Sequence, residues 1–473
     1  MRITATKLVA TSCYAMVCAF LSFVNISVRR GSESSDRRPE TDTVSTSKND
    51  HFQSDTPDVD RNRASDRILD QLSYSPPATN RTILIYLPHG SEIWGVPNGK
   101  SVFESNSCSV RDCFLSSTAD DYYNAPVVLY RHQLSRLPPR RVGQIWMLFV
   151  LESPVNTPSY SKPEYLNAIN FTASYRHDSD IVTPYGKFVP YSELDQRHLF
   201  EPNSNLASFR SDTREHSGQR NLPRAKGLGN ISTEPYRLGT TNFGPNLKPK
   251  SPNFARGKTH LAAWFVSNCF TDNNRDRYVS NLAKFIRVDV YGACGSLHCA
   301  RHNPGCNQML ARRYKFYLAF ENSNCNEYIT EKLFDIALKH NVVPVVMGAR
   351  RSDYARVAPP DSFIHVDDFD SPQQLAQYLT QLDKNDTAYN EYFRWKSTGT
   401  LIDTRFWCRL CAFLHGDPVQ KKVYSDFDAW WRPEGVCTRG RWPPDENTVA
   451  FGPQAWMSRI VRVGRMMLNS SFS

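Results

Sequence analysis

The stretch FYLAFENSNCNEYITEKLFDIALKHNVVPVVMG, Phe316–Gly348, predicts a β-α-β unit. Apolar residues from Phe316 to Phe320 indicate a buried strand, and Val342–Met347 indicates a second one. Between them we expect a polar turn and a helix from about Asn326 to His340. This arrangement, with a lysine near the helix start, suits a bound phosphate, because free N–H groups and the helix dipole favour an anion. It also fits an ordinary β-α-β unit whose polar residues only cap the helix, since no glycine-rich phosphate loop is present.

Strands and helices alternate through the rest of the chain, which predicts α/β architecture with mainly parallel sheets. The expected strands are ILIYL from about Ile83, Val127–Tyr130, Ile145–Leu151, Leu261–Ser267, Val288–Tyr291 and Phe363–Val366. One helix contains Arg275, Tyr278, Leu282 and Phe285. Another runs from Pro372 to about Leu382, with Ser371 as its N-cap. The second half therefore reads as a doubly wound domain.

The length of 473 residues predicts two domains with additional unstructured segments. Residues 81–190 and 259–411 are the expected domains, and residues 412–473 a C-terminal tail. Between the domains, residues 191–258 are rich in Asn, Ser, Pro, Gly and Arg, which indicates a loop-rich insertion or linker. The net charge of +10 is spread over scattered basic residues without a nucleic-acid-binding motif. We therefore expect no nucleic-acid partner.

An apolar run near the N-terminus, Leu8–Val28, is long enough to cross a bilayer as a helix. A cleaved signal peptide is the alternative, but no small-residue cleavage site follows, and Arg29 and Arg30 come next. We expect a signal anchor over residues 8–28, with residues 1–7 as a cytoplasmic tail and the remainder luminal. Residues 29–80, which are polar and poor in apolar periodicity, predict a flexible stem.

Cysteines and glycosylation sequons agree with a luminal location. Ten of the 12 cysteines lie beyond the apolar run, which suits an oxidising compartment with disulfide bonds. Sequons occur at Asn80, Asn170, Asn230, Asn385 and Asn469. Cys294, Cys299, His302 and Cys306 could bind zinc by ligand type, but in the lumen we favour disulfides.

The segment FENSNCNEYITEK, Phe320–Lys332, closely resembles the signature of the α1,3-fucosyltransferases, glycosyltransferase family 10. The similarity extends at lower density from about Arg81 to Cys411. It implies the GT-B fold, in which two Rossmann-like domains face each other across a cleft. The variant of the signature, together with the cysteines after Tyr291, looks most like invertebrate enzymes that act on the core of N-glycans.

The resemblance also implies roles for particular residues. Glu152 follows the strand WMLFVL and precedes Ser-Pro, at the strand end where α/β sheets place ligands. From the residues alone it could be a surface carboxylate, but ESP matches the motif that holds the family's proposed catalytic base. The GDP-sugar contacts implied by the family pattern are Arg275, Asn322, Tyr328, Glu331 and Lys332. Arginine and lysine suit the diphosphate, and a carboxylate suits sugar hydroxyls.

The implied reaction transfers fucose from GDP-β-L-fucose with inversion, in α1,3 linkage, and it needs no fixed metal. Asp178-Ser179-Asp180 has the form of a metal-binding D-x-D, but it lies in a segment that resembles the family's acceptor domain. Manganese stimulation without a fixed protein site is compatible with this assignment. Cys408 and Cys411 resemble the family's C-terminal C-x-x-C, which implies a bridge between them.

The leading hypothesis is a type II membrane enzyme of the Golgi that modifies a glycoprotein at the innermost GlcNAc of an N-glycan. A Lewis or LacdiNAc type, which acts on antennal GlcNAc, is the second hypothesis. A third is an inactive luminal glycan-binding protein, which retention of Glu152, Arg275, Glu331 and Lys332 disfavours.

Overall fold

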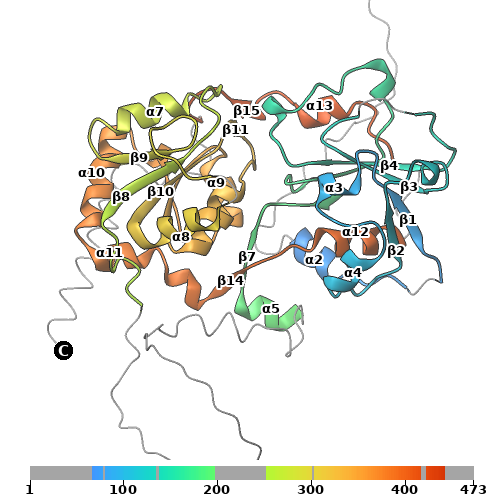
Figure 1. Cartoon of the computed structure of the whole chain (residues 1–473), viewed down its shortest axis with the longest axis horizontal. Helices are drawn as coiled ribbons and strands as arrows, with labels where there is room; N and C mark the ends of the chain where they lie inside the picture. Colours follow the sequence, from blue (N-terminus) through green and yellow to red (C-terminus); the bar gives the residue numbers. More distant parts are fainter. Residues whose placement is uncertain are drawn as a thin grey trace, which may run out of the picture. The chain divides into compact units, whose positions relative to one another are not determined.

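The computed structural model describes residues 66–77, 80–134, 138–197, 252–300, 303–416 and 422–442 (Figure 1). The predicted membrane span, most of the predicted stem and most of the 191–258 insertion lie outside these ranges. Within them, no helix has the length and apolar character needed to cross a membrane.

The first sheet has six parallel strands in the order β2-β1-β3-β4-β5-β6. Their bounds are Ile83–Tyr86 (β1), Cys113–Ser116 (β2), Val127–Arg131 (β3), Ile145–Val150 (β4), Phe171–Ser174 (β5) and Ile181–Val182 (β6). Leu129 and Met147 lie in the apolar cluster on one face, while Tyr130 and Leu148 lie in the cluster on the other. This alternation follows from the two-residue period of a strand and explains why every residue of β4 is apolar and buried.

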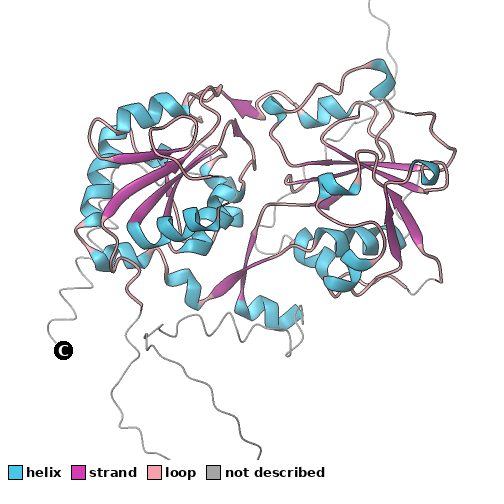
Figure 2. Cartoon of the chain, viewed as in Figure 1, coloured by secondary structure: helices cyan, strands magenta, loops and turns pink. Residues whose placement is uncertain are grey.

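The second sheet has five parallel strands in the order β13-β12-β10-β8-β9. They are His260–Phe265 (β8), Val288–Tyr291 (β9), Tyr314–Phe320 (β10), Val343–Met347 (β12) and Ile364–His365 (β13). Helices lie on both faces (Figure 2). Arg275–Leu282 (α7), Pro372–Asp383 (α10) and Asp386–Glu391 (α11) pack on one face, and Pro304–Arg313 (α8) and Arg351–Val357 (α9) pack on the other. Ser371 accepts a hydrogen bond from Gln374 N as the predicted N-cap of α10.

Short elements complete the described part of the chain. The helices are Arg67–Ser73 (α2), Ser91–Trp94 (α3), Ser101–Ser105 (α4), Tyr191–Arg197 (α5), Phe406–His415 (α12) and Phe427–Trp431 (α13). The strand pairs are Lys187–Pro190 (β7) with Gly399–Ile402 (β14), and Asn324–Cys325 (β11) with Cys437–Thr438 (β15). The single helical turns are Ala119–Asp121 (η1), Pro154–Asn156 (η2), Pro163–Tyr165 (η3), Lys332–Ala337 (η4), Leu338–His340 (η5), Val366–Asp368 (η6) and Arg394–Ser397 (η7).

Both sheets have the same strand order when their strands are numbered along the chain. In the first, β1 lies between β2 and β3, and in the second, β8 lies between β9 and β10. In the first sheet the chain therefore continues from β1 to β2 on one side, and later to β3 on the other side of β1. In the second sheet β9 and β10 flank β8 in the same way. Open α/β sheets bind ligands beyond the carboxyl ends of the strands at such a switch point. Two edges of this protein, β1/β3 and β8/β10, have this geometry.

Disulfides join residues that are far apart in sequence, and one pairing corrects an expectation. Cys408 and Cys411 do not bridge each other: Cys408 pairs with Cys108, and Cys411 pairs with Cys113. The two cysteines lie one turn apart on α12, so both reach the first sheet, on which α12 packs (Figure 1). The predicted boundary at residue 411 therefore falls inside a helix that belongs to the core of the first domain, and residues 427–431 also pack there.

All ten cysteines beyond residue 28 form disulfides. The remaining three pairs are Cys269–Cys294, Cys299–Cys306 and Cys325–Cys437. Disulfides rather than a zinc cluster therefore account for Cys294, Cys299 and Cys306, as expected, while His302 lies outside the described residues.

The predicted stem extends too far. Residues 66–77 are ordered, and α2 buries Ile68 and Leu69. Leu69 packs with Val189, Leu194 and Ile402, and Gln71 accepts a hydrogen bond of 2.9 Å from Arg409. This helix was not predicted because it has few apolar residues, of which Ile68 and Leu69 are buried.

This packing predicts the effect of truncation. A chain that begins at Asn80 loses the apolar contacts of α2, so its unfolding free energy should be lower by about 3 kcal/mol than that of a chain beginning at Asp66. Thermal unfolding of the two chains measures the difference, with Leu69→Ala in the longer chain as an independent probe. Equal melting temperatures for all three would show that α2 contributes nothing to stability.

The described sequons differ in accessibility, which predicts their use. Asn170 is 5% exposed; its amide donates to Lys422 O at 2.9 Å and accepts from Trp146 N at 2.9 Å. Asn80 and Asn385 are exposed. Because a glycan needs a solvent-facing amide, we expect peptide mapping after enzymatic deglycosylation in heavy-oxygen water to label Asn80 and Asn385. Label at Asn170 would contradict this burial.

Candidate functional site

The signature loop departs from the predicted helix. The helical turns begin only at Lys332, as a π-type turn over Lys332–Ala337, and not at Asn326. Asn324 and Cys325 pair instead with β15, and Cys325 is bonded to Cys437. Glu327 takes a left-handed backbone conformation (φ 60°), which a helix excludes. Residues 321–331 therefore form an extended loop at the carboxyl end of β10.

Glu152 follows β4 of the first sheet and contacts this loop. Its Oε1 atom accepts hydrogen bonds from Tyr328 Oη (2.6 Å), Asn322 Nδ2 (3.2 Å) and Ser153 N (2.9 Å). Its Oε2 atom receives no hydrogen bond from any residue in the described ranges. One carboxylate oxygen is thus held in place and the other remains to accept a proton.

Tyr328 is 2% exposed, so its hydroxyl is committed to this contact. Burial raises the pKa of Tyr328, and the carboxylates of Glu321 and Glu152 raise it further. The hydroxyl therefore stays protonated and donates to Glu152 across the biological pH range. The geometry brings three of the predicted residues, Glu152, Asn322 and Tyr328, into direct contact.

Arg275 is a buried cation at the start of α7. It is 4% exposed and donates to Phe320 O (2.7 Å) and Asn268 O (2.9 Å). Its Nε–H has no partner among the described residues, and no carboxylate there forms an ion pair with it. Burial lowers the pKa of Arg275 from the ordinary arginine value. A buried charge without a counter-charge is energetically costly, so this guanidinium favours binding of an anion.

Lys332 is engaged by two carboxylates. Its ammonium lies 2.8 Å from Glu321 Oε2 and 3.2 Å from Glu331 Oε1. Burial disfavours its charge, but the two carboxylates outweigh burial and raise the pKa of Lys332. Burial likewise disfavours the charge of Glu331, and Lys332 holds the pKa of Glu331 below its usual range. Lys332 and Glu331 are thus a charged pair at neutral pH.

Glu321 was missing from the sequence prediction. It is fully buried, and its carboxylate accepts from Thr330 N (2.8 Å), Thr330 Oγ1 (2.9 Å) and Lys332. Burial raises the pKa of Glu321 despite Lys332. The rule that singled out Glu152, a carboxylate directly after a buried strand, also applies to Glu321.

Tyr185 was missed as well. Its hydroxyl donates to Leu151 O at 2.8 Å. Burial raises the pKa of Tyr185, and the carboxylates of Glu331, Glu321 and Glu152 add to this effect. The next residue, Gly186, packs so closely that a Cβ would lie 2.5 Å from the Phe334 ring. No local pattern in the sequence marks this loop, because its role depends on contact with a segment about 150 residues away.

The predicted residues converge on one place, the carboxyl end of β10. Arg275 binds the last carbonyl of that strand, Asn322 follows it, and Lys332 binds Glu321, the first residue of the loop. The nearby Asn273 donates to Glu321 O at 3.0 Å. This end of β10 lies at the β8/β10 switch point, which combines cations, carboxylates and amides.

The D-x-D motif is engaged in protein contacts. Asp178 accepts from Arg176 at 2.9 Å and from Trp430 Nε1 at 3.1 Å. Asp180 accepts from Thr172 N at 2.9 Å and from Lys422. These contacts give both carboxylates roles in holding the 422–430 segment.

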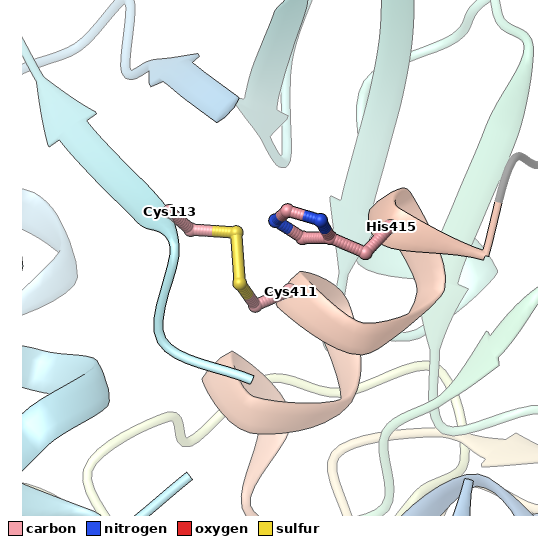
Figure 3. Close-up of side chains that lie close together, drawn as sticks. All are labelled: Cys113, Cys411 and His415. Carbon is pink, nitrogen blue, oxygen red and sulfur yellow. A yellow bond between two sulfur atoms is a disulfide. The ribbon is translucent and has the colours of Figure 1, made fainter. Parts of the chain in front are cut away.

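One group in the described ranges has metal-ligand types close together: Cys113, Cys411 and His415 (Figure 3). The two sulfurs form a disulfide and have no thiolate to offer. His415 Nε2 lies 3.0 Å from Asp112 O. This group is a structural cystine beside a histidine and does not suit a metal.

Comparisons with known proteins add to this geometry. The model "Fucosyltransferase, N-terminal" matches residues 78–186, and "Glycosyltransferase family 10 (fucosyltransferase) C-term" matches residues 255–430. Glycoprotein 3-alpha-L-fucosyltransferase A of Drosophila melanogaster is 39% identical over 392 residues, 80% of this chain and 67% of that protein. 3-galactosyl-N-acetylglucosaminide 4-alpha-L-fucosyltransferase of Homo sapiens is 38% identical over 68% of this chain and 75% of its own length. A crystal structure of an alpha1,3-fucosyltransferase with GDP-fucose aligns with 76% of this chain and 98% of its own, at 15% identity and a TM-score of 0.44.

The buried ion pair predicts a stability effect. Glu321→Gln removes the charge that faces Lys332 and weakens the acceptor for Thr330, so the free energy of unfolding should fall by about 3–5 kcal/mol. Glu391→Gln is the matched control, because the Arg394–Glu391 pair is exposed and should contribute less than about 1 kcal/mol. Denaturant unfolding measures both, and equal effects would refute the importance of burial at Glu321.

Proposed function

Because the chain belongs to glycosyltransferase family 10, the fucosyltransferases, we propose that it transfers L-fucose from GDP-β-L-fucose in α1,3 linkage, with inversion, to a GlcNAc of a glycoprotein glycan. The main support within the structure is the contact of Glu152 with Asn322 and Tyr328. This contact joins a carboxylate of the first sheet to the signature loop of the second.

Glu152 is the proposed general base. Tyr328, Asn322 and Ser153 N hold Oε1, which leaves Oε2 to take the proton from the acceptor hydroxyl. The hydroxyl oxygen then forms a bond to the anomeric carbon from the face opposite the diphosphate, and the bond to GDP breaks. A single displacement of this kind inverts the configuration and needs no second carboxylate.

The proposed donor site is the β8/β10 edge, with the two Rossmann-like halves of a GT-B fold on either side of the reacting sugar. Arg275 supplies a buried guanidinium whose Nε–H has no acceptor among the described residues, and Lys332 supplies an ammonium. Both would stabilise the negative charge that develops on the departing GDP. Glu331 and Asn322 would bind sugar hydroxyls.

We propose no fixed metal. The carboxylates of Asp178 and Asp180 are already paired with cations and other donors, and two cationic side chains are available for the diphosphate. Any stimulation by Mn²⁺ would then act through the substrate and not through a dedicated protein site.

The proposed compartment is the Golgi lumen, with residues 8–28 as a type II signal anchor. The support is the pairing of all ten cysteines beyond residue 28, which requires an oxidising compartment. The anchor itself rests on the length of the apolar run.

The innermost GlcNAc of N-glycans is the proposed acceptor, and antennal GlcNAc of the Lewis or LacdiNAc type is the alternative. The 39% identical Drosophila relative is named for a glycoprotein acceptor, whereas the 38% identical human relative is named for a 3-galactosyl-N-acetylglucosaminide, and this contrast supports the first. A panel that compares N-glycan cores with antennal disaccharides distinguishes them. Transfer confined to the antennal disaccharides would overturn the core assignment, and absence of transfer with retained glycan binding would indicate an inactive binder.

Glu152→Gln tests the base. The amide keeps the shape of the side chain but cannot accept the proton, so kcat should fall by roughly 10²-fold or more. GDP binding, measured by calorimetry, should persist because Glu152 does not belong to the diphosphate site. Arg275→Ala is the contrasting variant and should lose GDP affinity. Near-normal turnover by Glu152→Gln would remove this residue from the mechanism.

A further inference from the structure

A cavity lies at the switch point of the first sheet. Its volume is about 380 Å³, and its lining includes Tyr86, His89, Tyr122, Tyr123 and Tyr130. Tyr86 is the last residue of β1, and His89 lies in the loop that follows it. Tyr130 lies near the end of the neighbouring strand β3. The cavity therefore occupies the β1/β3 edge, where this sheet topology places ligands.

The lining is aromatic and uncharged. Four tyrosines, one histidine, two prolines and an alanine form it, without any Asp, Glu, Lys or Arg. The rings of Tyr86, Tyr122 and Tyr123 meet edge to face at centroid distances of 5.4 and 5.0 Å, which fixes their orientation. Burial lowers the pKa of His89, so its ring is neutral at pH 7 and offers one donor and one acceptor. Such a wall suits a neutral ligand that has both an apolar face and hydroxyl groups.

Tyr130 provides a second, independent observation. It is 1% exposed, and its hydroxyl has no hydrogen-bond partner in the part of the chain that the structure describes. An unpaired buried hydroxyl is costly, and in a native protein it calls for an explanation such as a bound water or ligand. The neighbouring Tyr122, by contrast, donates to Pro139 O at 3.2 Å.

The cavity lies on the same edge of the sheet as the proposed base. Glu152 follows β4, which pairs with β3, so the β1/β3 edge is one to two strand spacings away, about 5–10 Å along the sheet. An acceptor glycan whose GlcNAc hydroxyl lies at Glu152 extends over neighbouring parts of this edge.

We propose that the cavity binds a neutral pyranose residue of the acceptor glycan, distinct from the GlcNAc that receives fucose. The sugar ring packs on the tyrosine faces, and one of its hydroxyls pairs with Tyr130. This assignment rests on the proposed function for the identity of the glycan. The absence of charge in the lining excludes a nucleotide phosphate, and a single imidazole among the lining side chains does not make a metal site.

Sugar binding without donor tests the cavity directly. The probe is the free N-glycan core pentasaccharide, with three mannoses on two N-acetylglucosamines, titrated into the protein by saturation-transfer NMR. The variants are Tyr130→Phe, which removes only the unpaired hydroxyl, and Tyr123→Ala, which removes a half-exposed ring. Phe114→Ala is the matched control, since Phe114 is an exposed aromatic residue on β2 outside the lining.

We expect each cavity variant to weaken pentasaccharide binding by about tenfold, the value of one hydrogen bond or ring contact, while the control binds as the wild type does. The melting temperature of Tyr130→Phe should stay the same or rise. The KM for the pentasaccharide should rise in both variants with kcat retained, and the KM for the GlcNAc disaccharide alone should not change.

Unchanged pentasaccharide binding in Tyr130→Phe and Tyr123→Ala would overturn the proposal, as would equal KM changes for both acceptors. The wild type could also transfer no fucose while binding of the pentasaccharide is still lost in the two cavity variants. That result would overturn the proposed reaction but support the sugar cavity.

Discussion

The buried carboxylate of Glu321 sets the geometry of the site. It stands directly after β10, fully buried, and its two oxygens hold Thr330 and Lys332 from the far side of the signature loop. The backbone at Gly348 passes so close that a Cβ there would lie 2.6 Å from Glu321 Cγ. Glu321 begins the loop, and its carboxylate binds Thr330 and Lys332 at the other end, so it restrains the backbone between them. The restrained loop places Asn322 and Tyr328 in contact with Glu152.

The contact of Glu321 with Lys332 also distinguishes the roles of the two cations, Lys332 and Arg275. Lys332 already faces Glu321 and Glu331, so much of its charge is balanced before any substrate binds. Arg275 binds only carbonyl oxygens and retains an unpaired Nε–H among the described residues. A diphosphate would therefore gain more from Arg275, while Lys332 mainly orders the loop. The sequence suggested equal roles, because it shows the residue types but not their partners.

The sequence predicted what local patterns determine. Apolar runs located β4, β10 and β12, and the Ser-Pro start located α10 almost to the residue. Prediction from the sequence was wrong where contacts between residues far apart in the chain determine the structure. The C-x-x-C at Cys408 is one helical turn whose sulfurs face Cys108 and Cys113, some 300 residues earlier. The predicted helix start at Asn326 was wrong for the same reason, since β15 and Cys437 hold the preceding residues in an extended form.

The proposed base, Glu152, is held by groups from both halves of the protein. Glu152 comes from the first sheet, yet two of the three groups that hold Oε1 come from the signature loop. Other contacts reinforce the same junction: His177 N donates to Glu327 at 2.8 Å, and Tyr175 packs on Tyr328. Separation of the halves would remove two of the three groups that orient Glu152. Under the proposed function, proton acceptance by Glu152 therefore requires the contact between the two halves.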